Sequence, residues 1–187
     1  MNTGFGRADN SLVARWWWTI DRWSLAALMA IIGIGAILTM AATPPVAEKL
    51  GLDSFHFVRR QFVLLPLAIA IIFVVSLLDL STIRRIAAAV LVVTIVLLAV
   101  TLVAGAEIKG ARRWINLPGF SLQPSEFVKP SFAVICAWLL SMQRRQVGVP
   151  GDLIAFGIFA LVVLLLTRQP DIGMTVVVTA IWFSQYI

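Results

Sequence analysis

The sequence contains one cysteine, Cys136, and one histidine, His56, which excludes a disulfide scaffold, a zinc finger and a Cys-His nucleophile pair. Charge is also scarce: 13% of the residues are charged and 60% are hydrophobic, whereas soluble proteins carry about 25% charged residues. The mean hydropathy is +0.97. Because the charges fall in short clusters between long uncharged runs, the composition excludes a disordered chain and a soluble domain. It predicts an integral membrane protein.

Several catalytic motifs are absent as well. The sequence has no glycine-rich phosphate loop, no Gly-x-Ser-x-Gly and no two-histidine metal motif, so ATP-driven transport has no support in it. We expect no cofactor, and the sequence leaves a divalent cation requirement undecided. The net charge of +6 would suggest nucleic acid in a soluble protein. Here no basic run with interleaved aromatics lies outside the apolar segments, so we expect anionic lipid headgroups as counter-ions and no nucleic-acid partner.

Long apolar runs predict an all-α, polytopic helix bundle in the membrane. A spanning helix needs about 20 mainly apolar residues, because in lipid each backbone amide must be bonded within its own segment. Three uncharged runs meet this length, and three shorter ones do so when a charged residue lies at their rim. The predicted spans are 24–43, 61–78, 86–105, 126–142, 152–167 and 172–187. The last run has no flanking charge, so we expect an N-terminal portion of a longer protein.

Residues 1–23 are predicted to form a cytoplasmic interfacial segment. Aromatic and basic residues precede the first span in the manner of a membrane-surface anchor: Trp16, Trp17, Trp18, Trp23, Arg7, Arg15 and Arg22. Equal numbers of basic residues fall on the two sides of the membrane, so the positive-inside rule does not fix the orientation. The two tight loops with an Arg-Arg pair, 84–85 and 144–145, favour a cytoplasmic N-terminus. The basic residues of the outer face then serve either lipid headgroups or an anionic ligand.

The segment 106–125 is the most informative part of the sequence. It joins two spans and is predicted to be an outer loop, and its glycines and prolines argue against a continuous helix. It concentrates basic and aromatic residues: Lys109, Arg112, Arg113 and Trp114. Guanidinium groups bind phosphate through two parallel hydrogen bonds, and an interfacial Trp can cover a sugar or a headgroup. A diphosphate-linked lipid could bind to these basic and aromatic side chains, although basic-aromatic clusters are common beside membranes.

Two charged residues are predicted in the first turn of the fourth span. Glu126 and Lys129 are three residues apart, so they share a helical face and can neutralise each other. They form either a structural ion pair at a helix start or a substrate clamp. Asp171 is placed at the start of the sixth span, where a helix-capping role is favoured over a functional one.

Three motifs in this order resemble the SEDS family, the shape, elongation, division and sporulation proteins. They are GARRWINL (110–117), QPSEFVKP (123–130) and RQPDIGM (168–174), supported by FHFVRRQ (55–61). The resemblance extends over nearly the whole chain from about residue 20. The Arg-Arg-Trp run at 112–114 and the Trp-rich N-terminal stretch are more similar to the division members than to the elongation members.

This resemblance implies a peptidoglycan glycosyltransferase of about ten spans with a cytoplasmic N-terminus. Such enzymes polymerise lipid II at the outer face of the bacterial plasma membrane, here at the division septum. Their partners are a monofunctional class B penicillin-binding protein and other division proteins. In the family's mechanism an acidic residue activates the acceptor 4-hydroxyl, which displaces undecaprenyl diphosphate. We expect that residue beyond Ile187, so the present chain alone is expected to be inactive.

The resemblance also assigns the basic outer loop to the substrate. The residues expected to line the lipid II cavity are Lys109, Arg112, Arg113, Trp114, Glu126, Lys129, Arg59 and Arg60. Two alternatives stay open: a flippase that moves lipid II across the bilayer, and a non-catalytic scaffold of the division machinery. Charges within the membrane suit an enzyme or a transporter better than a scaffold.

Overall fold

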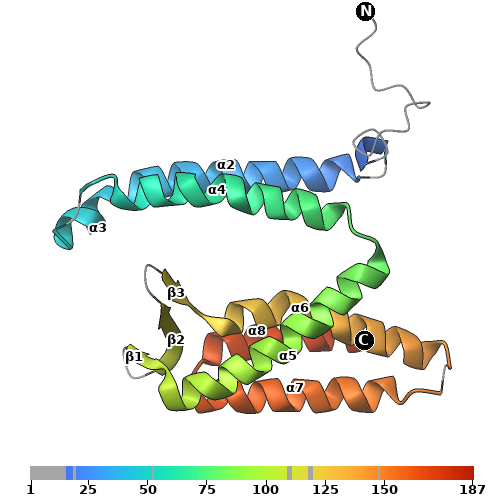
Figure 1. Cartoon of the computed structure of the whole chain (residues 1–187). Coiled ribbons are helices and arrows are strands. Elements are labelled where there is room, and N and C mark those ends of the chain that lie inside the picture. The colour runs from blue at the N-terminus through green and yellow to red at the C-terminus, as the bar shows by residue number, and fades with distance from the viewer. Residues whose placement is uncertain (1–15, 19, 52, 109–110, 118–119, 147) are drawn as a thin grey trace, which may run out of the picture. The chain divides into compact units, whose positions relative to one another are not determined.

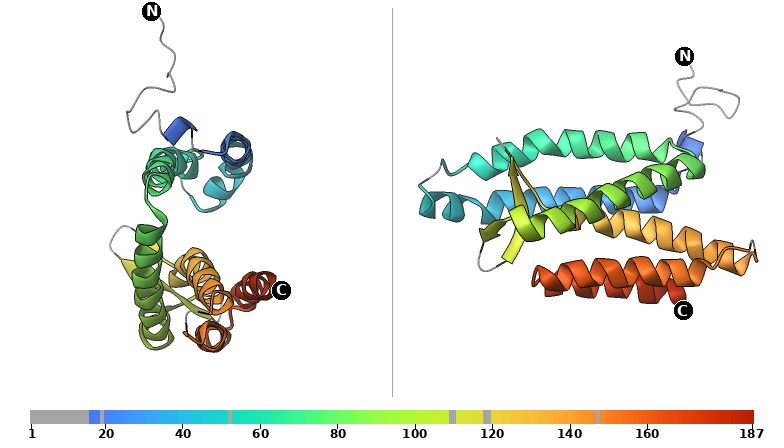
Figure 2. Two further views of the ribbon diagram at one scale, coloured as in Figure 1. Left: turned by 90° about the vertical axis from the view of Figure 1, so that its right-hand side faces the viewer. Right: turned by 60° about the horizontal axis from the view of Figure 1, so that its bottom comes forward.

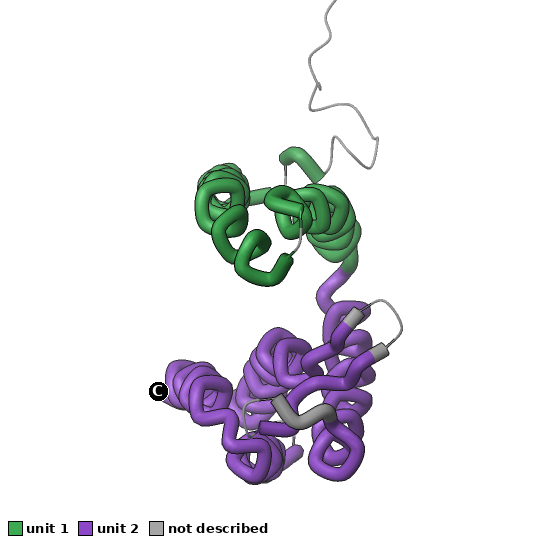
Figure 3. The backbone as a smooth tube through the Cα atoms, turned by 90° about the vertical axis from the view of Figure 1, so that its left-hand side faces the viewer, with its two compact units in different colours: residues 1–78 green, residues 79–187 purple. Residues whose placement is uncertain are grey.

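The computed structural model describes residues 16–18, 20–51, 53–108, 111–117, 120–146 and 148–187, and these form helices and one small sheet (Figure 1). The chain divides into two compact units, residues 1–78 and 79–187 (Figure 3).

The first unit contains α2 (Arg22–Ala42), α3 (Pro44–Lys49) and α4 (His56–Ser76). Asp21 is the N-cap of α2, where its carboxylate accepts from the backbone N–H groups of Trp23 and Ser24. The Ser24 hydroxyl, followed by the Trp23 N–H, holds the pKa of Asp21 below its usual value. The two long helices pack against each other, yet α2 buries none of its residues. Apolar helices with so little buried surface are suited to lipid.

The second unit contains α5 (Leu80–Ala104), α6 (Pro124–Arg144), α7 (Gly151–Arg168) and α8 (Ile172–Tyr186). Helix α6 packs against the other three (Figure 2). The side chains of Leu98, Phe132, Val162 and Val178 are completely buried between them. Cys136 is equally buried and has a free thiol, so it is an apolar core residue.

Between α5 and α6 the chain forms a three-stranded antiparallel sheet, with β1 (Ala106–Ile108), β2 (Ala111–Leu117) and β3 (Phe120–Leu122) in sequence order. It lies where α5 and α7 end and where α6 and α8 begin (Figure 1). A folded loop was predicted here, and the sheet was not. Two of its strands are only three residues long, which is too short for a pattern of alternating polarity to be recognised.

Helices occupy all six predicted spans. Five are long and apolar enough to cross a membrane, and Ile172–Tyr186 is a shorter apolar helix. The chain is thus a polytopic membrane helix bundle. Two helices begin five or more residues earlier than predicted, because α4 includes Arg59 and Arg60 in its first turns and α5 begins after the Asp79 N-cap. Charges that end an apolar run do not end a helix, since long basic side chains can extend into the interface.

The approach of α7 to α6 gives a matched pair of glycine substitutions. A Cβ on buried Gly151 would collide with the carbonyl group of Leu139, whereas a Cβ on Gly157 would meet no atom within 4 Å. We expect Gly151→Ala to destabilise the full-length protein by about 1–3 kcal/mol, the usual range for overpacking. Gly157→Ala should leave the thermal unfolding midpoint in detergent unchanged or raise it slightly. Equal midpoints for the two variants would contradict this packing.

Candidate functional site

The two neighbouring arginines of β2 have different surroundings. The Arg113 guanidinium donates to the Asp171 carboxylate, with 3.3 Å between Nη1 and Oδ1. The pairing with β1 is irregular here, because Glu107 pairs with Arg112 and Ala106 with Trp114, which makes Arg113 the extra residue of a β-bulge. Arg112 is exposed, whereas Arg113 and Trp114 are partly buried. The strand thus carries an anchored arginine directly after an exposed one.

The carboxylate that holds Arg113 also begins a helix. Asp171 precedes α8 and accepts from the Met174 backbone N–H at 3.4 Å through the same Oδ1 atom. The side chain of Asp171 is only 4% exposed and that of Arg113 is 34% exposed. A buried carboxylate requires a compensating charge, so the position of β2 is coupled to the start of α8.

A second polar contact fixes the same turn to α5. The amide of Gln169 donates to the Leu98 carbonyl at 2.9 Å and to the Thr101 hydroxyl at 2.6 Å. The Thr101 hydroxyl in turn donates to the Leu98 carbonyl at 2.8 Å. Gln169 and Thr101 are buried, and buried bonds of this kind are costly to break. The turn between α7 and α8 therefore holds the end of α5, which leads directly into β1.

Two acceptor atoms in this turn have no hydrogen-bond partner among the described residues. They are Oε1 of Gln169 and Oδ2 of Asp171, and both are buried. An unsatisfied buried acceptor costs about 1–3 kcal/mol of stability. Such atoms in a native structure mark a functional role or the place of a water or ion. The turn is therefore a polar centre within an otherwise apolar bundle.

The Glu126–Lys129 pair forms as the spacing predicts. Lys129 Nζ lies 2.6 Å from Glu126 Oε2, and the side chains are 31% and 53% exposed respectively. Glu126 is exposed and Lys129 is partly buried, whereas the neighbouring Val128 and Phe132 are completely buried. Exposed ion pairs contribute about 0–1 kcal/mol to stability. The pair therefore adds little to the stability of the fold, and stability alone does not explain its presence.

The remaining predicted site residues lie elsewhere. Lys109 is outside the described residues. Arg59 and Arg60 belong to the first unit, where Arg59 lies 3.8 Å from Asp53 and Arg60 lines a shallow apolar cavity with Phe57 and Leu64. Their predicted approach to the outer loop stays a prediction.

The sequence did not reveal the partner of Arg113. The capping role predicted for Asp171 is confirmed by its bond to Met174, but its second role was missed and Gln169 was not considered. The two residues of the contact are 58 positions apart, and no spacing rule joins them. One signal was available in the sequence: Gln169 and Asp171 flank Pro170 between two apolar runs. Polar side chains within the membrane require hydrogen-bond partners.

Comparison with known proteins identifies the family. A family model with the description "Cell cycle protein", FTSW_RODA_SPOVE, matches residues 22–185. The chain belongs to this family. The resemblance to the SEDS proteins drawn from the three motifs is therefore confirmed.

The similar sequences and structures include FtsW and RodA proteins. The "Probable peptidoglycan glycosyltransferase FtsW" of Caulobacter vibrioides is 37% identical over 176 residues, which cover 94% of this chain and 45% of that relative. A chain from "Structural coordination of polymerization and crosslinking by a peptidoglycan synthase complex" matches with a TM-score of 0.69 and 28% identity, over 91% of this chain and 47% of its own. The rod shape determining protein RodA of Thermus thermophilus gives a TM-score of 0.66 and 30% identity, over 86% of this chain and 51% of its own. The chain thus spans about half the length of these relatives.

The contact between Arg113 and Asp171 predicts an asymmetric response to substitution. Arg113→Ala leaves a nearly buried carboxylate without a partner, which costs about 3–5 kcal/mol. Asp171→Asn keeps a helix cap and leaves only a partly exposed guanidinium, so we expect a loss of about 1 kcal/mol. Thermal unfolding of the full-length protein in detergent measures both. Equal losses, or a larger loss for Asp171→Asn, would contradict the contact.

Proposed function

We propose that the full-length protein polymerises lipid II into glycan strands at the outer face of the plasma membrane during cell division. In this proposal its N-terminus is cytoplasmic and it acts at the septum. Its partners are a monofunctional class B penicillin-binding protein and other division proteins. Family membership and the names of the relatives support the activity. The basic outer loop supports a role for this chain in substrate binding.

The observation that carries this role is the exposed Arg112 on β2, directly before the anchored Arg113. Arg113 is fixed by Asp171, whereas Arg112 is exposed and Trp114 follows two residues later. We assign the donor diphosphate to the Arg112 guanidinium, which can form two parallel hydrogen bonds to phosphate oxygens. The Trp114 ring is assigned to the sugar or to the start of the lipid. Arg113 then acts as a positioning residue.

Lys129 supplies a second cation in this proposal. Helix α6 begins two residues after β3 ends, which places the Glu126–Lys129 pair close along the chain to the sheet. Glu126 holds the ammonium in one position, so less side-chain entropy is lost when an anion binds. Lys109, Arg59 and Arg60 remain proposed contributors to the same site.

The chemistry follows from the leaving group. The acceptor 4-hydroxyl attacks the anomeric carbon of the donor, its proton passes to a carboxylate, and the bond to undecaprenyl diphosphate breaks. Negative charge grows on the diphosphate as that bond breaks, and preorganised cations stabilise it most effectively where water is excluded. We assign this stabilisation to the residues of the present chain and the carboxylate to the remainder of the protein.

Substitution at Lys129 tests this assignment. Full-length protein, co-purified with its penicillin-binding partner in a cross-linking-blocked form, is incubated with labelled lipid II. We expect Lys129→Ala to reduce the rate of glycan formation about 100-fold, the effect of removing one group that stabilises developing charge. Arg144→Ala, at the opposite end of α6, is the matched control and should retain the wild-type rate.

The outcomes separate the possible functions. A wild-type rate for a folded Lys129→Ala protein would make the Glu126–Lys129 pair purely structural. Folded wild-type protein that forms no polymer would instead favour the flippase, or the scaffold if lipid II is not moved either.

A further inference from the structure

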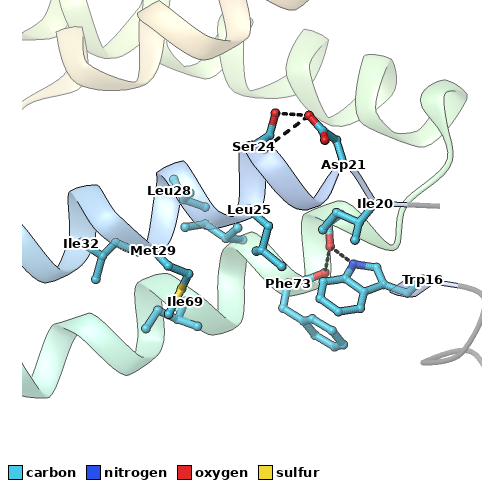
Figure 4. Close-up of a pocket in the computed structure, with 12 residues that line it drawn as sticks. Trp16, Ile20, Asp21, Ser24, Leu25, Leu28, Met29, Ile32, Ile69 and Phe73 are labelled. Carbon is cyan, nitrogen blue, oxygen red and sulfur yellow. Dashed lines mark hydrogen bonds between the residues drawn. The ribbon is translucent and has the colours of Figure 1, made fainter. Parts of the chain in front are cut away.

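The first unit contains a cavity that the proposed function does not use. It has a volume of about 480 Å³ and lies between α2 and α4 (Figure 4). Its walls are apolar, with Leu25, Met29 and Ile32 from α2 facing Ile69 and Phe73 from α4. The volume falls within the range of about 300–1,000 Å³ that is typical of ligand sites.

One end of this cavity is lined by polar groups. Trp16 donates from its indole N–H to the Ser76 hydroxyl at 2.7 Å, and its ring meets that of Phe73 edge-on at 4.9 Å. Asp21 and Ser24 line the same end, with their carboxylate and hydroxyl 2.6 Å apart (Figure 4). The opposite end, at Ile32 and Ile69, is apolar. The cavity is therefore polar at one end and apolar at the other, like the headgroup and hydrocarbon regions of one bilayer leaflet.

A cation lies beside the polar end. The Arg22 guanidinium lies 5.6 Å from the ring centre of Trp17 and 5.4 Å from that of Trp18, and Trp17 adjoins Trp16 at 6.4 Å. Within the part of the chain that the structure describes, no carboxylate forms an ion pair with Arg22. Aromatic rings hold a guanidinium through its faces, which leaves its N–H edge directed at hydrogen-bond acceptors.

We propose that this cavity binds one anionic glycerophospholipid, with the phosphate at Arg22 and one acyl chain between α2 and α4. The length of the cavity favours an acyl chain over a protein helix. Its α2 wall extends from Ser24 to Ile32, a rise of about 12 Å. That distance is close to one leaflet of a hydrocarbon core about 30 Å thick, whereas a spanning helix needs the full thickness.

Lipid binding to the full-length protein tests the proposal. Native mass spectrometry of the detergent-purified protein, with added phosphatidylglycerol or phosphatidylcholine, counts the bound lipids and gives their affinities. We expect one tightly bound lipid, with phosphatidylglycerol preferred about fivefold, the factor expected of one basic residue at an anionic surface. Arg22→Gln should abolish this preference and leave the acyl chain bound. As a control, Arg84→Gln removes a guanidinium that lies 5.6 Å from the Trp138 ring in the other unit and should change nothing.

A pair of tryptophan substitutions tests the cavity itself. Met29→Trp places an indole in the cavity and should eliminate the bound lipid. Met40→Trp adds the same ring to α2 at a similarly exposed position, with Met40 49% and Met29 50% exposed, and should retain it. Loss of the lipid from Met29→Trp supports the proposal only if Met29→Trp and Met40→Trp unfold at the same temperature. The proposal fails if Arg22→Gln keeps the preference, if folded Met29→Trp keeps the lipid, or if the wild-type protein binds none, an outcome that would assign the cavity to a protein helix.

Discussion

A buried carboxylate at the start of α8 determines how the sheet between α5 and α6 is held. Asp171 is almost inaccessible to solvent and Arg113 is the cation that compensates it. Burying a carboxylate without such compensation is costly, so β2 must keep Arg113 turned toward the bundle. Arg113 is also the extra residue of the bulge in β2, and the exposed Arg112 directly precedes it. One ion pair thus positions the part of the strand that carries Arg112.

The surrounding contacts strengthen this constraint. The sheet pairs only with itself, through strands of three to seven residues, and isolated sheets of this size are marginal in stability. Gln169 fixes the turn beside Asp171 to the end of α5, and α6 continues from β3. Both ends of the sheet and its middle strand are therefore attached to the bundle. A loop fixed in this way can present cations to a ligand with little loss of entropy on binding.

The sequence was sufficient to predict the long helices, but it was not sufficient to predict the contacts that build the site. Apolar runs between charge clusters predicted the six long helices, because lipid permits few other structures, whereas the short helix α3 was not predicted. Their starts were less certain, and α4 begins five residues before Gln61 because a helix can continue through Arg59 and Arg60. The local pair Glu126–Lys129 followed from helical spacing. The Arg113–Asp171 contact did not, because it joins a strand to the turn before α8, 58 positions away, and no local spacing relates the two segments.

The most direct test of the account is inhibition by undecaprenyl diphosphate, which carries the diphosphate of the donor without its sugars. Its inhibition constant is measured for glycan formation by the full-length protein with its partner, for the wild type and for Arg112→Ala. If the exposed Arg112 on β2 binds the diphosphate, the inhibition constant should rise at least about tenfold, the loss expected for one charge-assisted contact of about 1.5–3 kcal/mol. An unchanged constant in a folded variant would contradict the account, because the diphosphate would then be bound elsewhere.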